Sequence, residues 1–516
     1  MNSNSLVLTI DFGTQSVRTA LINKKGEIVY ITRKPYNPVF FSVKKGYAEQ
    51  RADYYWDCLV ECLKKLSSEN KNNLSKIIAM TVTTFRDSAV LLDKEYNPLR
   101  PIILWMDQRL AKAEERLPLI HRFLFALVGM TDAVQMNRTR TAAHWIKENE
   151  PELWSVVHKY VNISTFINYK LTGELADSPS GMTGHYPLHY KKGVWYKEGA
   201  MKGRIYGVPN RMLPKLVKPG GTIGYLQEDV AKMCGLPEGL PLIATGSDKG
   251  CETIGLGCLT PDVGAISYGT ACSIEVSNTH YYEAERFLPA YNASVPGLYN
   301  MDVQIYRGYW MLRWFASEFA SELENEAKNK HLPIEVILDD WLKDVPVGSD
   351  GLILQPYWGP GLARPLAKGA IIGYSNVHTR KHMYRAIVEG IAFALREGLD
   401  LIEKAQKRKV KSLRISGGGS LSDEICQITA DIFGLEISRV QTIESTSLGA
   451  AIATFAAVKE FDSVSDAVKN MSRITETFHP NQANHRIYNR IYKNVYLKVY
   501  PRLKPLDIEI NNIFKR

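Results

Sequence analysis

Two short hairpins with a Gly-Thr turn, half a chain length apart, constrain the fold of this sequence more than any other feature. The first, in "LVLTIDFGTQSVRTALI", places Gly13 and Thr14 between two β-type patterns, and "GAISYGTACSIEV" repeats the unit at Gly269 and Thr270. Alternation of side chains with a period of two indicates strands on both sides of each turn. Two such units 256 residues apart in a chain of 516 residues predict an internal duplication of a βββαβα type of domain.

The remaining segments fit an α/β protein with two domains, which we expect at residues 1–257 and 258–516. The segment "KIIAMTVTTFRDSAVLLD" predicts two strands around a polar turn, and residues 108–215 contain several helical patterns. A long amphipathic helix is expected from Met383 to about Ala405, followed by the strand "SLRIS" and the helix "EICQITADIFG". The tail after Tyr500 is expected to be peripheral.

Composition and charge favour a cytoplasmic protein rather than a secreted, membrane or nucleic-acid-binding one. No apolar run is long enough to cross a bilayer, and the N-terminus lacks a basic region followed by an apolar one. The seven cysteines are an odd, scattered set, which favours buried reduced thiols. The net charge of +10 comes from short lysine clusters without interleaved aromatic residues, which favours a solvated surface and anionic phosphorylated ligands.

Both Gly-Thr turns are candidate phosphate loops. Gly13 lets the backbone approach an anion, so that N–H groups and the Thr14 hydroxyl can face phosphate oxygens. Asp11, at the end of the preceding strand, could hold Mg²⁺ directly or through water, and Arg18 could add a positive charge. A plain hairpin turn explains either motif alone about as well, but the pair is stronger than one.

Two further strand ends carry candidate groups. In "ISGGGSLSDE", Gly417, Gly418 and Gly419 leave room for a purine or a phosphate before a helix N-terminus, although a simple connection would look the same. In "LPLIATGSDKG", Asp248 follows an apolar strand, where a general base is expected in a layered α/β protein. A helix-capping role is the alternative for Asp248.

The segments "TTFRDS" and "LWMDQR" supply a possible sugar site. They bring Arg86, Asp87 and Asp107 to strand ends, with Trp105 as an aromatic wall. Mixed carboxylate and guanidinium groups bind hydroxyls well, but a surface ion-pair cluster would have the same composition.

Taken together, these segments resemble the FGGY carbohydrate kinase family, which includes xylulokinase, glycerol kinase and ribulokinase. The likeness covers nearly the whole chain in the expected order, from "DFGTQSVR" through "TVTTFRDSAVLLD", "ILWMDQR", "GSDKG" and "SYGT" to "SGGGSLSDEICQITADIFG" and "ESTSLGAAIA". The resemblance implies two actin-like (ribonuclease-H-like) ATPase domains, with ATP and a small sugar or polyol in the cleft between them. A homodimer is compatible with it.

Residue by residue, the resemblance implies that Asp248 is the catalytic carboxylate and Asp11 the aspartate on the metal side. Thr14, Arg18 and the loops at Gly269-Thr270 and Gly417-Gly418-Gly419 match nucleotide contacts. Arg86 and Asp87 fall where glycerol kinase has an Arg-Glu pair that holds the acceptor, and where xylulokinase has Met-His. The expected cofactors are ATP and Mg²⁺, and the acceptor is a ketopentose or a polyol.

Three positions depart from the family pattern: Lys249 replaces a usual Gln, Ala142 replaces a usual Lys before Trp145, and Gly373-Tyr374 replaces Gly-Leu. A cation at Lys249 could lower the pKa of Asp248 or contact an anionic substrate, or it could point away. The alternatives are a catalytically idle or sugar-sensing relative and, from the same superfamily, an actin-like or heat-shock-chaperone-like ATPase.

Overall fold

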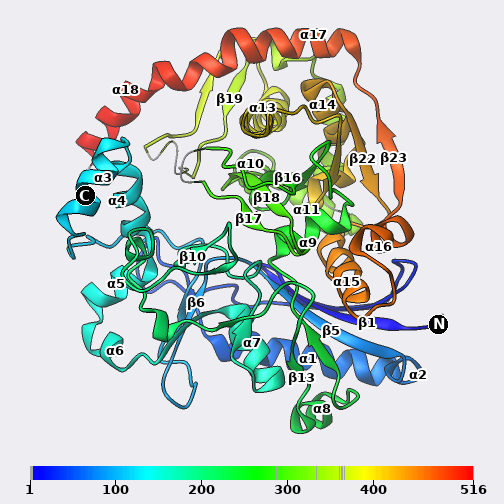
Figure 1. Cartoon of the computed structure of the whole chain (residues 1–516). Coiled ribbons are helices and arrows are strands. Elements are labelled where there is room, and N and C mark those ends of the chain that lie inside the picture. The colour runs from blue at the N-terminus through cyan, green and yellow to red at the C-terminus, as the bar shows by residue number, and fades with distance from the viewer. Residues whose placement is uncertain are drawn as a thin grey trace.

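The structure, a computed structural model, describes residues 4–285, 288–332, 334–359, 361, 364 and 366–514. Two large sheets dominate it, one from each half of the chain (Figure 1). The first sheet has the order β3 (Ile28–Pro35), β2 (Ser16–Asn23), β1 (Leu6–Phe12), β5 (Ile77–Thr84), β14 (Pro241–Ile243) and β13 (Thr222–Tyr225). The second has the order β17 (Tyr291–Asn292), β18 (Tyr299–Ile305), β16 (Cys272–Asn278), β15 (Val263–Tyr268), β21 (Ser412–Ser416), β22 (Glu436–Val440) and β23 (Ile474–Phe478).

The two sheets have the same topology. Each begins with three antiparallel strands, β1-β2-β3 or β15-β16-β18, and continues on the other side of its first strand with two parallel strands, β5 and β14 or β21 and β22. An antiparallel strand, β13 or β23, closes each sheet at that edge. This repeated order confirms the internal duplication that the two Gly-Thr hairpins predict.

The side chains of β1 alternate between the two faces of the first sheet, and both faces are covered by helices. Leu6, Leu8, Ile10 and Phe12 belong to a core shared with helix α1 (Ala52–Glu69), while Val7 packs on the opposite face with α15 (Ser445–Ala457). Successive side chains of a strand point to opposite faces, so a strand buried on both sides reads as continuously apolar. Helices α7 (Ile163–Thr172) and α8 (Glu228–Cys234) complete the face covered by α1.

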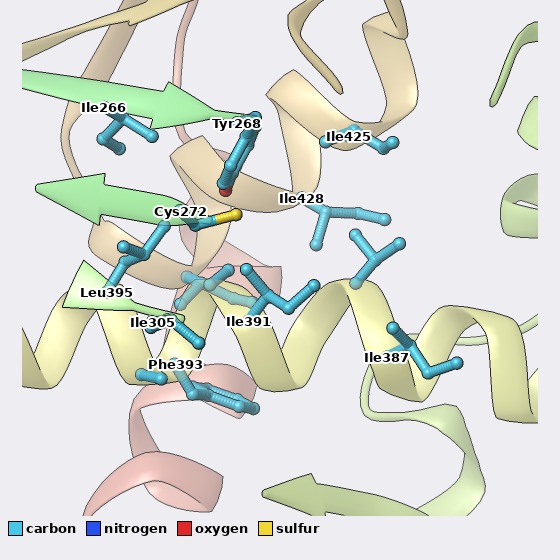
Figure 2. Packing of buried hydrophobic residues seen from close by; sticks show 14 of the residues in the cluster. Ile266, Tyr268, Cys272, Ile305, Ile387, Ile391, Phe393, Leu395, Ile425 and Ile428 are labelled. Atoms are coloured by element: carbon cyan, nitrogen blue, oxygen red, sulfur yellow. The ribbon is translucent and has the colours of Figure 1, made fainter. Parts of the chain in front are cut away.

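The core of the second half is built on the long helix α13 (Arg380–Gln406), which confirms the helix expected near Met383–Ala405. Its Ile387, Ile391 and Leu395 repeat every four residues and therefore share one face. Figure 2 shows Tyr268 of β15 and Cys272 of β16 above the helix, on the side to which Ile391 and Leu395 point, with Ile428 of α14 (Asp423–Phe433) nearby.

Two helices lie between the sheets: α9 (Asp248–Gly255), which follows β14, and α15, which follows β22 (Figure 1). They touch backbone to backbone. A Cβ added at Gly449 would lie 1.8 Å from the carbonyl oxygen of Cys251, and one added at Gly255 would lie 1.9 Å from that of Ser445. Only glycine permits this approach.

Smaller sheets and further helices are added to the two large sheets. A four-stranded sheet joins β4 (Glu49–Gln50), β7 (Ile102–Ile103), β6 (Ala89–Leu92) and β8 (Lys159–Asn162), and three two-stranded pairs are β9 (Ala176–Asp177) with β12 (Lys215–Leu216), β10 (Leu188–His189) with β11 (Val194–Trp195), and β19 (Ile353–Gln355) with β20 (Ala370–Ile372). The remaining α-helices are α2 (Lys71–Leu74), α3 (Leu119–Leu127), α4 (Thr131–Arg140), α5 (Ala142–Asn149), α6 (Pro151–Val156), α10 (Trp310–Phe319), α11 (Ser321–Lys330), α12 (Ile334–Lys343), α16 (Val464–Met471), α17 (Gln482–Ile491) and α18 (Leu497–Ile513).

Helix α18 runs along the outer edge of the second half and is mostly exposed, as expected for a peripheral tail (Figure 1). Among the helices described, none has the length and apolarity that a membrane span requires. All seven cysteines are free and buried, which confirms the expected structural thiols.

Candidate active site

A cavity of about 540 Å³ lies where the two sheets meet, and both Gly-Thr turns open into it. A volume in this range suits a small-molecule site. Most of the residues singled out from the sequence line it: Thr14, Arg18, Arg86, Asp87, Trp105, Asp248, Gly269, Thr270, Gly417 and Gly418. The structure therefore gathers into one site groups that are up to four hundred residues apart in the sequence.

Asp248 reaches this cavity because strand β14 leads through Gly246 into the first turn of α9. Ser247 is the N-cap of that helix and its Oγ accepts a hydrogen bond from the Gly250 N–H at 3.4 Å, so the capping role falls to the neighbour of Asp248. A Cβ at Gly246 would lie 2.1 Å from Ser294 Oγ and 2.9 Å from Ser180 Cβ, so there is little room for a side chain at this point. Asp248 is left as the first residue of α9, with its carboxylate lining the cavity.

The surroundings of Asp248 raise its pKa above the ordinary value of an aspartic acid. Burial is the main cause, and the nearby cations of Lys249 and Arg86 oppose it. A carboxylate with a raised pKa accepts a proton more readily than an exposed one, which suits a general base.

The two Gly-Thr turns present backbone to the cavity in slightly different ways. At the first, the Gly13 N–H donates to Ser16 O at 3.0 Å, and a Cβ at Gly13 would meet only that oxygen, at 3.5 Å. At the second, the carbonyls of Gly269 and Thr270 accept from the N–H groups of Tyr309 and Trp310 at 3.2 and 3.3 Å. These bonds fix the second loop to the start of α10.

Asp11 lies behind the first turn and does not line the cavity itself. Its Oδ2 is 3.3 Å from Arg18 Nη1, and the same nitrogen lies 3.3 Å from Glu444 Oε2. Burial raises the pKa of Asp11 to about 7, the Arg18 charge opposes this, and Asp248 and Glu444 add to it. Oδ1 of Asp11 is buried and has no hydrogen-bond partner among the described residues. A buried carboxylate oxygen without a donor, close to other carboxylates, fits a cation.

The three glycines after β21 have different neighbours. Gly417 has φ +88°, and a Cβ there would lie 2.5 Å from Tyr268 O. At Gly419 a Cβ would lie 2.2 Å from the ring of Tyr309, so this glycine serves packing and does not line the cavity. Gly418 has no atom within 4 Å of such a Cβ and opens into the cavity. Of the three glycines, Gly418 therefore offers bare backbone to a ligand.

The guanidinium of Arg86 joins the two halves rather than standing free. Its Nη1 donates to Asp302 Oδ2 on β18, its Nε donates to Ser247 Oγ at 3.0 Å, and Glu275 lies 3.8 Å from Nη2. The group also lies over the ring of Tyr291, 5.1 Å from its centroid. Arg86 lines the cavity with its charge already paired with Asp302.

Asp87 is held by His185 in a strained position. Its backbone φ is +55°, and its carboxylate accepts from the His185 N–H at 2.8 Å and contacts Nδ1 at 2.6 Å. Burial alone would raise the pKa of Asp87, but the contacts with His185 outweigh it and the net shift is downward. A positive φ at a non-glycine residue costs free energy and is often found at ligand sites.

Asp107 is not part of the cavity lining, although Trp105 is. Its Oδ2 accepts the Ala48 N–H at 2.6 Å, and both oxygens accept from the side chain of Arg109 at 2.8 and 2.9 Å. With its hydrogen bonds made to Ala48 and Arg109, the Asp107 carboxylate supports the loop at residue 48. Of the expected sugar contacts, Asp107 is therefore the one that does not line the cavity.

The sequence motifs gave no sign of several other residues that line the cavity: His185, Tyr206, Tyr291, Gln304 and Tyr306. They come from connecting segments and from the edge of the second sheet, where no motif marks them. Asp302 carried no such signal either, because its strand "YNMDVQI" also contains the polar residues Asn300 and Gln304; the fold buries this carboxylate, which then requires a partner.

Comparison with known proteins gives a consistent result over the whole chain. Residues 6–255 match the model of the FGGY family of carbohydrate kinases, N-terminal domain, and residues 264–458 match that of its C-terminal domain. A xylulose kinase of Lactococcus lactis is 30% identical over 485 residues, 93% of each chain. An L-fuculokinase of Escherichia coli is 27% identical over 485 residues, 92% of this chain and 97% of its own.

Solved structures agree on the fold. A ligand-bound xylulose kinase of Lactobacillus acidophilus superposes with a TM-score of 0.81 at 21% identity, covering 97% of this chain and 98% of its own. A gluconate kinase of the same organism gives 0.80 at 22% identity, covering 97% and 98%. The architecture is thus the two-domain actin-like fold that the resemblance implied.

Proposed function

The chain belongs to the FGGY family of carbohydrate kinases and phosphorylates a sugar with ATP, and we propose that Asp248 is its general base. Family membership removes the actin-like and chaperone-like alternatives, and the comparisons give no support to an idle relative. The proposal also assigns a role to each domain: residues 1–257 bind the acceptor and contain the general base, and residues 258–516 bind most of the nucleotide.

One observation carries the assignment of Asp248: its carboxylate shares a single cavity with the Gly13-Thr14 and Gly269-Thr270 turns. A phosphoryl transfer enzyme needs the acceptor hydroxyl, the γ-phosphoryl group and a proton acceptor in one place. Arg18 and Gly418 line the same cavity and complete the proposed nucleotide contacts.

In the proposed reaction, the oxygen of the acceptor hydroxyl bonds to the γ-phosphorus of ATP. Asp248 accepts the proton that this hydroxyl loses. The bond between that phosphorus and the bridging oxygen breaks, and ADP leaves with the electron pair. Backbone N–H groups of the two turns would stabilise the charge on the phosphoryl oxygens. The raised pKa of Asp248 keeps its proton affinity high enough for this transfer.

Asp11 is the side chain that fits the expected magnesium ion. Its buried Oδ1 lacks a donor, and no three potential metal ligands converge in the described part of the chain. A single carboxylate with water and substrate phosphates completing the shell is how Mg²⁺ is usually bound. When bound there, the ion would supply positive charge to the ATP phosphates.

The acceptor that the site supports best is a neutral small sugar of the ketopentose type. Arg86 already pairs with Asp302 and Glu275, so it offers N–H donors rather than a free charge for a carboxylate. Asp87, His185 and Gln304 add hydroxyl-binding groups, and Trp105 and Tyr306 add aromatic surface. Several of the most similar curated proteins are xylulose kinases. A polyol would use the same groups.

The test combines an acceptor screen with the variant Asp248→Asn. Purified protein is assayed for ADP release with ketopentoses, pentitols, glycerol and gluconate. With the preferred acceptor, Asp248→Asn should lower kcat by about 10²- to 10⁴-fold, while the affinity for ADP changes little. Asp229→Asn, in the exposed first turn of α8, is the matched control and should keep full activity. A kcat of Asp248→Asn near that of the parent would place the base elsewhere.

Two expectations stay predictions: a cytoplasmic location and a homodimer. Light scattering of the purified protein measures the second.

A further inference from the structure

Lys249 departs from the usual family residue, and the structure shows where its side chain goes. It is the second residue of α9, directly after Asp248, and it lines the cavity. Its ammonium does not point away from the site. It reaches across to the second half, where Nζ donates to Ser267 Oγ on β15, and it lies 2.9 Å from Glu252 Oε2 on its own helix.

This position is beside the second phosphate loop. Ser267 precedes Gly269 by two residues, and a Cβ built on Gly269 would lie 3.9 Å from Lys249 Nζ. The ammonium therefore lies beside the backbone of the Gly269-Thr270 turn, and Asp248, whose Oδ1 accepts the Lys249 backbone N–H at 2.8 Å, lines the same cavity. In the proposed reaction, the phosphoryl group passes between these two features.

The bonding of Lys249 leaves capacity for a ligand. An ammonium has three N–H donors, and two acceptors are seen in the part of the chain described here: one carboxylate oxygen and one neutral hydroxyl. A phosphate oxygen is a stronger acceptor than a serine hydroxyl, because it is charged. It could take the remaining donor or replace the bond to Ser267. Glu252 lines the same cavity and keeps the cation charged, since it raises the pKa of Lys249 against the effect of burial.

A purely structural ion pair is the simpler alternative. Burying a charged pair costs desolvation free energy that its Coulombic attraction often fails to recover, so burial alone gives no reason for a lysine here. A role in catalysis would explain the lysine, because a preorganised cation in a site shielded from water stabilises negative charge that develops there during the reaction.

Resting on the proposed function, we propose that Lys249 is a catalytic residue that binds the phosphoryl group in transit between ATP and the acceptor. The acceptor oxygen bonds to phosphorus, the bond to ADP breaks, and the proton passes to Asp248. Lys249 keeps its own proton throughout. It neutralises negative charge on a non-bridging oxygen and so lowers the barrier without exchanging atoms.

Lys249→Met tests this proposal, because methionine keeps much of the length of lysine and removes its charge. We expect kcat to fall by about 10²- to 10³-fold, as for removal of one charge-stabilising donor. Lys249→Arg should recover part of the loss. Lys24→Met is the matched control: Lys24 pairs with Glu460 at 2.8 Å between the same two halves but does not line the cavity, and it should keep parent kcat.

The deciding measurement is the affinity for MgADP with aluminium fluoride in the presence of acceptor, compared with MgADP alone. Lys249→Met should weaken the fluoride complex by at least 10²-fold and MgADP by less than about threefold, because only the fluoride complex mimics the group in transit. Equal losses for both ligands, or no loss for either, would overturn the proposal. Binding of the fluoride complex needs no proton transfer, so this measurement does not depend on the role of Asp248. An active Asp248→Asn variant would refute the proposal that Asp248 is the general base and would leave the proposal for Lys249 standing.

Discussion

Replacing Gly449 by alanine tests whether the contact between α9 and α15 sets the position of Asp248. The added Cβ would lie 1.8 Å from Cys251 O and 2.6 Å from the backbone nitrogen of Gly255. Real Cβ contacts are essentially never under 3.0 Å, so the helices must move apart by at least 1.2 Å, the difference between 1.8 and 3.0 Å. Because the obstructing atoms are backbone, no side chain can rotate to relieve the contact.

The separation should lower both stability and rate. Overpacking in a filled core costs about 1–3 kcal/mol, and the better helix propensity of alanine returns up to about 1 kcal/mol. With the full return, the net loss is up to about 2 kcal/mol, which corresponds to a Tm lower by up to about 8 °C for a domain of this size. Asp248 is the first residue of the displaced helix, and a misplacement of about 1 Å can cost about 10²-fold in rate.

The assay measures Tm by differential scanning fluorimetry and kcat by ADP release. Gly418→Ala is the control for stability, since a Cβ at Gly418 meets no atom within 4 Å and should leave Tm unchanged. Parent values of Tm and kcat in Gly449→Ala would refute the reasoning, because they would mean that the two helices can separate without disturbing the carboxylate of Asp248.

Two further predictions concern pH. Because the pKa of Asp248 is raised, kcat/KM should rise with pH along an acid limb whose midpoint lies above the ordinary aspartate value of 3.8; a flat profile down to pH 4 would contradict the role of Asp248. Burial, with the charge of Asp302, raises the pKa of Glu275 from 4.5 to about 8, so its contribution to stability is present below pH 4.5 and is lost as pH rises toward and through 8. The Tm of the parent should therefore fall between pH 6 and 9 more than that of Glu275→Gln, and equal declines in the two proteins would show that another group is responsible.

The sequence predicted those parts of the fold that depend on local pattern. The strands around Gly13 and Gly269 follow from their period of two, and α13 follows from its apolar repeat. The repeated sheet order follows from the duplicated hairpins. Asp248 was identifiable because it ends an apolar strand between glycines, a feature that lies within a few consecutive residues.

Features that depend on distant partners could not be predicted. Arg86 pairs with Asp302, 216 residues later, and Asp87 pairs with His185, 98 residues later. No local pattern encodes either distance. The packing of Gly419 against Tyr309 also depends on a partner that is distant in the sequence. The three consecutive glycines therefore look alike in the sequence, although Gly419 serves packing and Gly418 faces the cavity.

Asp107 illustrates a different limit. A polar residue at a strand end has the composition of a sugar contact, but its oxygens are satisfied by Arg109, two residues on, and by the Ala48 N–H. Composition reports which groups are present. Whether a carboxylate has spare hydrogen-bonding capacity is decided by the fold.

The burial of all seven thiols gives this protein an internal reporter of unfolding. Burial raises the pKa of Cys234 to about 11 and those of Cys258 and Cys426 to about 12. At neutral pH fewer than about one in a thousand such groups is a thiolate, the form that reacts with alkylating reagents. Labelling of the native protein should therefore be slow and limited by opening of the chain, and the order in which cysteines of the two halves react would reveal which half opens first.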